Sequence, residues 1–234
     1  MKRKQYKVSE AQIPMFDFDH PHMPVLDVSR CEARLINYET AARMVETYHY
    51  AHRVPSIVVA VGMFVDGILA GCLTYGIPPS HQLCEAFGES GNVLELNRLF
   101  VFDWVRRNGE SWLIGQSFQK VPNPYNVLVS YADISQSHIG YIYQATNWLY
   151  TGLGNTGGSG SREKIINGQR MHAKAINNTY GTIKKDDLYN LGLEVQEIEK
   201  SFKHRYVYFL GNKRQRRELR KALKWPVLPY PKGK

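Results

Sequence analysis

Apolar and polar positions alternate along the chain in a way that predicts short strands and helices. Helix-forming residues over 37–50 predict a helix, for which Asn37 is a suitable N-cap. Two apolar, β-rich runs over 57–64 and 68–75 are separated by an Asp-Gly pair, which predicts a β-hairpin. The first part of the chain is therefore expected to fold as a helix followed by two antiparallel strands.

Two strand–helix units follow this hairpin. Apolar residues over 93–101 and 127–133 predict strands, and helices are expected over 110–120 and about 138–150. Strand, helix and strand in this order predict a parallel pair joined by a right-handed crossover. The pattern therefore indicates an α/β (α+β) fold with a central mixed, twisted sheet flanked by helices.

Three regions are expected along the chain. They are an irregular arm over 1–30, one domain over 31–211 and a basic extension over 212–234. A strand over 205–210 should close the domain, and the extension should form a helix over 213–224. We expect that the extension can be removed without loss of the fold.

Composition excludes several classes of protein. The chain has 234 residues, of which 43% are hydrophobic and 22% charged, and this is not typical of disordered or collagen-like chains. Three cysteines are too few for a disulfide framework and form no Cys-x-x-Cys pair. No apolar stretch is long enough to span a bilayer. We therefore expect a cytoplasmic protein with no membrane partner.

The positive charge is concentrated at the ends of the chain. Residues 200–234 hold twelve Lys and Arg but one acid, and residues 1–7 hold four basic residues and no acid. Residues 8–199 hold fourteen basic and twenty acidic residues, which makes this part mildly acidic. This distribution predicts a polyanionic partner that the ends of the chain contact.

The turn between the strand 93–101 and the following helix resembles that of the GNAT acyltransferase fold. There an Arg/Gln-x-x-Gly-x-Gly/Ala turn holds the pyrophosphate of the cofactor with its backbone N–H groups. The similar stretch here is Arg106-Arg107-Asn108-Gly109-Glu110-Ser111, with Ser in place of the final Gly or Ala and an acid before it. The cofactor-binding residues that this resemblance implies are Arg106, Arg107, Asn108, Gly109 and Ser111.

Several linked segments resemble the Mom family of phage DNA-modification proteins. They are Glu95–Phe100, Asn108–Trp112, Ser130–Asp133, Gly140–Trp148 and Tyr150–Gly152. The resemblance implies a GNAT-like catalytic domain that converts DNA adenine to an N6-carbamoylmethyl (acetamido) derivative, which protects DNA from restriction in the host cytoplasm. The donor that it implies is acetyl-CoA or another acyl or aminoacyl compound, and iron is a further candidate.

Three residues are the main candidates for chemistry. Arg98 lies inside an apolar strand, where it would form an ion pair with Glu95 or Asp133 or contact the substrate, and the resemblance favours the substrate. Asp133 ends a parallel strand, where it could act as a base or orient the amine, or cap the next helix. For Tyr143 the resemblance implies a general acid or a substrate contact.

Other candidates are less specific. Tyr141 and Tyr143 lie two apart on an expected helix, so one should be buried and Tyr141 is offered as a substrate contact. Ser111 is a candidate catalytic residue that would donate to a phosphate rather than act as a nucleophile. Tyr75 ends the hairpin, where it would contact DNA or pack between strands.

The segment after the first helix carries His49, Tyr50, His52 and Arg53. The resemblance places the acceptor site here, and it makes His49 and Tyr50 catalytic candidates and Arg53 a phosphate contact. The two histidines lie three apart and could share a metal ion, or each could be an ordinary hydrogen-bonded histidine.

Double-stranded or locally unpaired DNA is the partner expected on this interpretation, because an enzyme that acts on a base must reach it outside the stack. The expected phosphate contacts in the C-terminal helix are Lys213, Arg214, Arg217, Arg220 and Lys224. Alternative hypotheses are an N-acetyltransferase acting on a protein or RNA amine, and a DNA-binding module without chemistry. The oligomeric state is left open, a dimer included.

Overall fold

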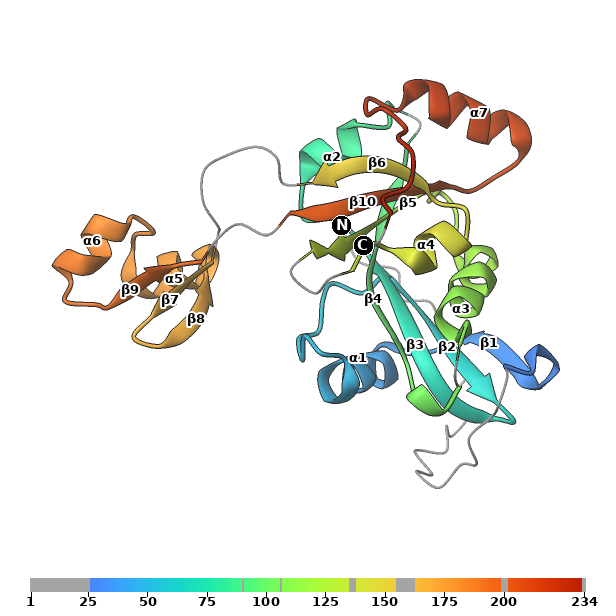
Figure 1. Ribbon diagram of the computed structural model, residues 1–234, viewed down its shortest axis with the longest axis horizontal. Helices are drawn as coiled ribbons and strands as arrows, with labels where there is room; N and C mark the ends of the chain where they lie inside the picture. The colour runs from blue at the N-terminus through green and yellow to red at the C-terminus, as the bar shows by residue number, and fades with distance from the viewer. Residues whose placement is uncertain are drawn as a thin grey trace.

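The computed structural model describes residues 26–89, 91–105, 107–134, 138–154, 163–198 and 202–232 (Figure 1). It contains a seven-stranded sheet with the order β1-β2-β3-β4-β5-β10-β6 and a three-stranded sheet with the order β8-β7-β9. Helices flank the larger sheet, so the predicted α/β class is confirmed. No helix within these ranges is long and apolar enough to cross a membrane.

The large sheet mixes parallel and antiparallel strands. Its strands are β1 (Cys31–Leu35), β2 (Val59–Val65), β3 (Ile68–Gly76), β4 (Val93–Val101), β5 (Val127–Asp133), β6 (Leu149–Gly154) and β10 (Lys203–Phe209). Its helices are α1 (Tyr38–Tyr48), α2 (His81–Glu85), α3 (Gly109–Ser117), α4 (Tyr141–Ala145) and α7 (Lys213–Ala222). Short 3-10 turns are η1 (Val28–Arg30), η2 (Asp103–Val105) and η3 (Phe118–Lys120). The predicted hairpin is β2–β3, and the predicted parallel pair is β4–β5.

Local sequence signals account for several of these elements. The Asn37 side chain accepts a hydrogen bond from the Thr40 N–H at 2.9 Å, which caps α1 as predicted. At the start of α7, Asn212 and Gln215 form a capping box. The hairpin turn uses positive φ angles at its Asp-Gly pair, which a two-residue turn of this kind requires.

The helix expected over 138–150 is wrong beyond residue 145. Helix α4 ends at Ala145, Asn147 adopts a left-handed φ of 60°, and the chain continues as strand β6. Trp148 is fully buried. Burial of this side chain against the sheet outweighs the local helix pattern, because a large aromatic contributes much of the hydrophobic free energy.

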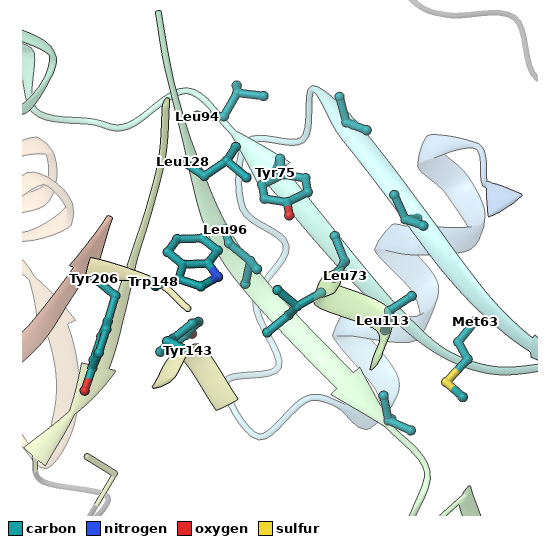
Figure 2. Close-up of a cluster of buried hydrophobic side chains, with 14 of the residues drawn as sticks. Met63, Leu73, Tyr75, Leu94, Leu96, Leu113, Leu128, Tyr143, Trp148 and Tyr206 are labelled. Carbon is teal, nitrogen blue, oxygen red and sulfur yellow. The ribbon is translucent and has the colours of Figure 1, made fainter. Parts of the chain in front are cut away.

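Helices cover both faces of the large sheet. The face covered by α3 and α4 holds the largest apolar cluster, which includes Leu96, Leu113, Tyr143 and Trp148 (Figure 2). On the other face, α1 covers β2 and β3, whereas α2 and α7 cover β4, β5 and β10. We call these the α3–α4 face and the α1–α7 face.

A small unit is inserted between β6 and β10, and the pattern of apolar positions within 31–211 does not predict it. It consists of β7 (Glu163–Ile166), β8 (Gln169–His172), α5 (Ala173–Tyr180), α6 (Lys185–Asn190) and β9 (Val195–Glu197). It has an apolar cluster of its own, formed by Ile166, Ile176, Leu188 and Val195. Figure 1 shows it set apart from the large sheet.

The C-terminal extension is part of the fold. Leu219 is buried, and Trp225 packs against Phe87 with 5.5 Å between ring centroids. Further along, the Leu228 N–H donates to the Tyr150 carbonyl at 2.9 Å. These contacts argue against the expectation that 212–234 can be removed without loss of the fold, because its apolar side chains pack on the α1–α7 face.

Candidate active site

Strands β4 and β5 separate in the middle of the sheet. Their parallel pairing runs from Val93–Val127 to Glu95–Val129 and ends there. Just beyond, the Ser130 hydroxyl lies 2.8 Å from the Leu96 carbonyl oxygen and still links the two strands. We call this place the strand parting. From this point the two parallel strands stay apart toward their carboxyl ends, the side at which α/β sheets bind ligands.

A carboxyl group lies at the parting on the α1–α7 face. Side chains alternate along β4, so Glu95 shares the face of Val93, which packs toward α2 and α7. Glu95 is half-buried, and this burial raises the pKa of its carboxyl, although Lys203 and Arg98 act in the opposite direction. A carboxylate with a raised pKa suits the acceptance of a proton.

Asp133, at the end of β5, takes part in an ion pair. The Lys203 Nζ lies 3.1 Å from its Oδ2, and the two residues are direct partners across the β5–β10 pairing. The side chain of Asp133 is 21% exposed. The structure therefore brings a carboxylate and an ammonium group to the same edge of the sheet as Glu95, while the catalytic role of Asp133 stays a prediction.

The Arg98 guanidinium donates hydrogen bonds to main-chain carbonyl oxygens. Its Nε and Nη2 donate to the Arg53 carbonyl at 3.2 and 3.1 Å. These two bonds attach the segment before β2 to strand β4. Asn97 donates to the Ser56 carbonyl at 2.9 Å. A Cβ on Gly76 would lie 1.9 Å from that oxygen, so glycine is required there. No ion pair joins Arg98 to Glu95 or Asp133 in the described part of the chain. Arg98 instead fixes the segment 53–56.

The predicted acceptor segment presents one buried and one exposed ring. His49 is 5% exposed, and burial together with the nearby charge of Arg98 lowers its pKa to about 4, which keeps it neutral. Tyr50 is 67% exposed and stacks on His49 with centroids 4.3 Å apart. Tyr50 therefore offers an aromatic surface beside the α1–α7 face.

The two histidines use their Nδ1 atoms in local contacts. His49 Nδ1 accepts from the Ala51 N–H at 3.1 Å, and His52 Nδ1 lies 2.9 Å from the Glu46 carbonyl. Within the described ranges, no group of three or more His, Cys, Asp or Glu side chains is arranged to hold a metal ion. The shared metal at His49 and His52 stays a prediction.

Tyrosines on the α3–α4 face are buried and hydrogen-bonded. Tyr143 is 6% exposed, its hydroxyl lies 2.8 Å from Ser130 Oγ, and burial raises its pKa to about 12. Tyr141 is 65% exposed, so the two tyrosines do lie on different sides of α4. Tyr75 is fully buried, with its hydroxyl 2.6 Å from Ser117 Oγ. The predicted DNA contact by Tyr75 is therefore wrong.

The turn that resembles a pyrophosphate site does begin a helix. Asn108 adopts a left-handed φ of 73°, and the first hydrogen bond of α3 runs from the Trp112 N–H to its carbonyl. Three backbone N–H groups, at 109–111, precede that bond and point out of the helix end. The Ser111 hydroxyl donates to the Asn108 carbonyl at 3.1 Å. Arg107 is exposed. Arg106 lies outside the described residues.

A cavity of about 280 Å³ adjoins this helix end on the α3–α4 face. Its lining is mostly apolar and comes from Leu26, Val28, Asn108, Ser111, Trp112, Ala145 and Thr146. Outward N–H groups beside an apolar hollow fit a donor with an anionic group and an uncharged arm. The negative charge of Glu110 in the first turn of α3 disfavours a bound anion here. The case for a donor site therefore depends on the N–H groups and the cavity.

Comparison with known proteins identifies the family. The family model described as the Mom protein family matches residues 30–232. The chain belongs to the Mom protein family. No curated protein matches the chain.

Solved structures similar to this Mom-family chain are acetyltransferases. One is Arabidopsis thaliana NAA60 in complex with acetyl-CoA, with a TM-score of 0.46, 14% identity, and 77% of this chain and 98% of that chain covered. Another is an N-acetyltransferase from Staphylococcus aureus, with a TM-score of 0.42, 13% identity, and 77% and 99% covered.

Sequence reasoning missed two polar residues at the parting, Glu95 and Ser130. The sequence suggests Glu95 only as an ion-pair partner of Arg98, although an acid inside an apolar strand needs a partner or a ligand just as an arginine does. Ser130 carries no comparable signal, because a serine is tolerated in many strands. Its position becomes meaningful only when β4 and β5 are seen to separate.

Proposed function

We propose that this Mom-family protein is a transferase that modifies the N6 amine of adenine in DNA, to give a carbamoylmethyl (acetamido) type product. Family membership supports the reaction class. The strand parting is the observation that carries the proposal, because it brings Glu95 on one face of the sheet close to Tyr143 on the other. A donor and an acceptor can then approach the same point from opposite faces.

The donor side is the α3–α4 face. An acyl or aminoacyl donor, such as acetyl-CoA, would place an anionic group at the N–H groups of 109–111 and its arm in the adjoining cavity. When bound, an acetyl donor would supply an acyl carbon and give an N6-acetyl group, whereas the carbamoylmethyl product requires a donor whose activated carbon is the CH2 that carries the carboxamide. Tyr143 is buried on this side, so its hydroxyl is protected from solvent and can give a proton to the leaving group.

The acceptor side is the α1–α7 face. The adenine amine is a weak nucleophile because its lone pair is delocalised into the ring, so proton removal must accompany attack. Glu95 is the proposed base, and the Asp133–Lys203 pair borders the same edge. Tyr50 is the proposed stacking surface for a base that has left the duplex.

DNA docking is proposed for α7, which lies on the α1–α7 face. Leu219 is its buried residue, and the basic side chains around the helix are exposed. The proposed phosphate contacts are Lys213, Arg214, Arg217, Arg220 and Lys224. Contacts of this kind provide affinity without sequence preference, and their strength falls with salt.

Mass spectrometry of nucleosides tests the proposal. Plasmid DNA from cells that express the protein should contain N6-modified deoxyadenosine, whose mass distinguishes a carbamoylmethyl from an acetyl group. DNA from cells that express Glu95→Gln at equal soluble level is the control. Unmodified deoxyadenosine in both samples would refute the proposal. Acetylated protein or RNA amines would then favour an N-acetyltransferase, and DNA affinity alone would favour a binding module.

A further inference from the structure

Ser130 makes two buried hydrogen bonds at the strand parting. The residue is 1% exposed, and its Oγ lies 2.8 Å from the Leu96 carbonyl oxygen and 2.8 Å from the Tyr143 hydroxyl. A serine hydroxyl has one proton, and a carbonyl can only accept. Ser130 therefore donates to the Leu96 carbonyl and accepts from the Tyr143 hydroxyl. In this resting state the phenol O–H points to Ser130 Oγ.

We propose that Ser130 is a positioning residue that acts through Tyr143, an inference that rests on the proposed function. As the adenine nitrogen bonds to the donor carbon, the bond from that carbon to the leaving group breaks. Glu95 takes the proton of the amine, and the Tyr143 O–H turns from Ser130 to the leaving group and gives it the proton. The Ser130 O–H then turns from the Leu96 carbonyl to the phenolate oxygen and stabilises it.

The surroundings of Tyr143 make such a partner necessary. The phenol is buried, and Glu95 and Tyr50 lie close enough to disfavour a phenolate further, whereas a hydrogen bond donated by Ser130 would act in the opposite direction. In an apolar site, an unpaired oxyanion carries a large desolvation cost. A hydroxyl that is already in place avoids the reorganisation that a solvent molecule would require.

The competing explanation is that Ser130 is only structural. Its bond to Leu96 joins β4 and β5 just beyond their last paired residues, and that link does not involve Tyr143. The two explanations differ in a double-mutant cycle. A residue that acts through Tyr143 has no further effect once the phenol is gone, whereas a strand link keeps its effect.

The chain contains a matched control for this test. Ser117 is also fully buried on the α3–α4 face, and its Oγ lies 2.6 Å from the hydroxyl of the buried Tyr75. Ser117→Ala therefore removes the same kind of serine–tyrosine contact from a tyrosine other than Tyr143. Any general cost of losing a buried hydroxyl should be similar in both variants.

The experiment measures the accumulation rate of N6-modified deoxyadenosine after induction, with thermal midpoints of the purified variants. We expect Ser130→Ala to lower the rate about 10-fold relative to Ser117→Ala, and to add no loss in a Tyr143→Phe background. An equal further loss in that background would overturn the proposal. If Tyr143→Phe leaves no measurable rate, the contrast between Ser130→Ala and Ser117→Ala decides, and equal rates overturn the proposal.

A second measurement does not depend on activity. In protein labelled at the tyrosine Cζ carbon, the Tyr143 resonance, assigned with Tyr143→Phe, should move in Ser130→Ala and stay in place in Ser117→Ala. An unmoved resonance would overturn the inference. If the wild-type protein modifies no adenine while this resonance moves, the proposed function fails, although the Ser130–Tyr143 contact is confirmed.

Discussion

The two faces of the sheet at the strand parting differ in how far their polar groups are buried and hydrogen-bonded. On the α3–α4 face, Tyr75 and Tyr143 are buried, and each hydroxyl is bonded to a buried serine. On the α1–α7 face, Tyr50 is 67% exposed, and Glu95 is half-buried beside the Asp133–Lys203 pair. The first face holds its protons in fixed positions, whereas the second leaves charges and one ring open to solvent.

This difference matches the two partners in the proposed reaction. A small donor needs little open surface, so the proton donor beside it can be fixed by packing, as Tyr143 is. A DNA base arrives with its backbone, so its site must be open and surrounded by charge. The Glu95 carboxyl lies where the two environments meet, and burial there raises its pKa.

Substitution of Glu95 should have the largest effect. Removal of a general base costs about 100-fold or more in rate, so Glu95→Gln should reduce modified deoxyadenosine by that factor. Its DNA affinity should equal that of the wild type, as measured by anisotropy of a labelled duplex. The base is active when ionised, and its pKa is raised, so the wild-type rate should rise with pH through a range above that of an ordinary glutamate. A weakened affinity in Glu95→Gln would mean that Glu95 serves binding rather than chemistry.

A glycine substitution tests whether the segment 53–56 is held closely against β3 and β4. Gly76→Ala places a methyl group 1.9 Å from the Ser56 oxygen, so the segment must move, at a cost of about 1–3 kcal/mol. The free energy of unfolding by urea measures this cost. Gly115→Ala is the control, because a Cβ there meets nothing within 4 Å. It should be neutral or stabilising by about 0.5–1 kcal/mol, since Gly115 lies in α3. Equal effects of both substitutions would show that the segment is not held closely.

Charge reversal on α7 tests the open face as a DNA surface. Arg217→Glu with Arg220→Glu should weaken duplex binding about 10-fold at moderate salt and reduce the slope of log K against log salt by about 2. Lys184→Glu with Lys185→Glu, on the exposed surface of the inserted unit, changes the net charge by the same amount. If both pairs weaken binding equally, net charge rather than α7 governs affinity. Point substitutions are required because the extension is part of the fold.

The sequence predicts the elements better than it predicts the site. The hairpin and both helix caps depend on neighbouring residues, so local signals find them. The burial of Tyr75 depends on Ser117, which lies 42 residues away, and the meaning of Ser130 depends on where β4 and β5 separate. The end of α4 depends on the burial of Trp148. Each miss involves contacts between residues distant in the chain, which composition and periodicity do not encode.

The smallest expected effect at neutral pH concerns His49, which lies beneath the exposed ring of Tyr50. Burial and the charge of Arg98 lower its pKa from 6.5 to about 4, so the folded state binds this proton less readily than the unfolded state. His49 therefore costs no stability above pH 6.5, and it destabilises the fold increasingly as the pH falls from 6.5 toward 4. Urea unfolding of wild type and His49→Gln, measured at intervals over this range, should show a shallower loss in the variant. Parallel pH profiles would mean that the folded and unfolded states bind the His49 proton equally well, and at acidic pH Tyr50 would then stack on a cation rather than on a neutral ring.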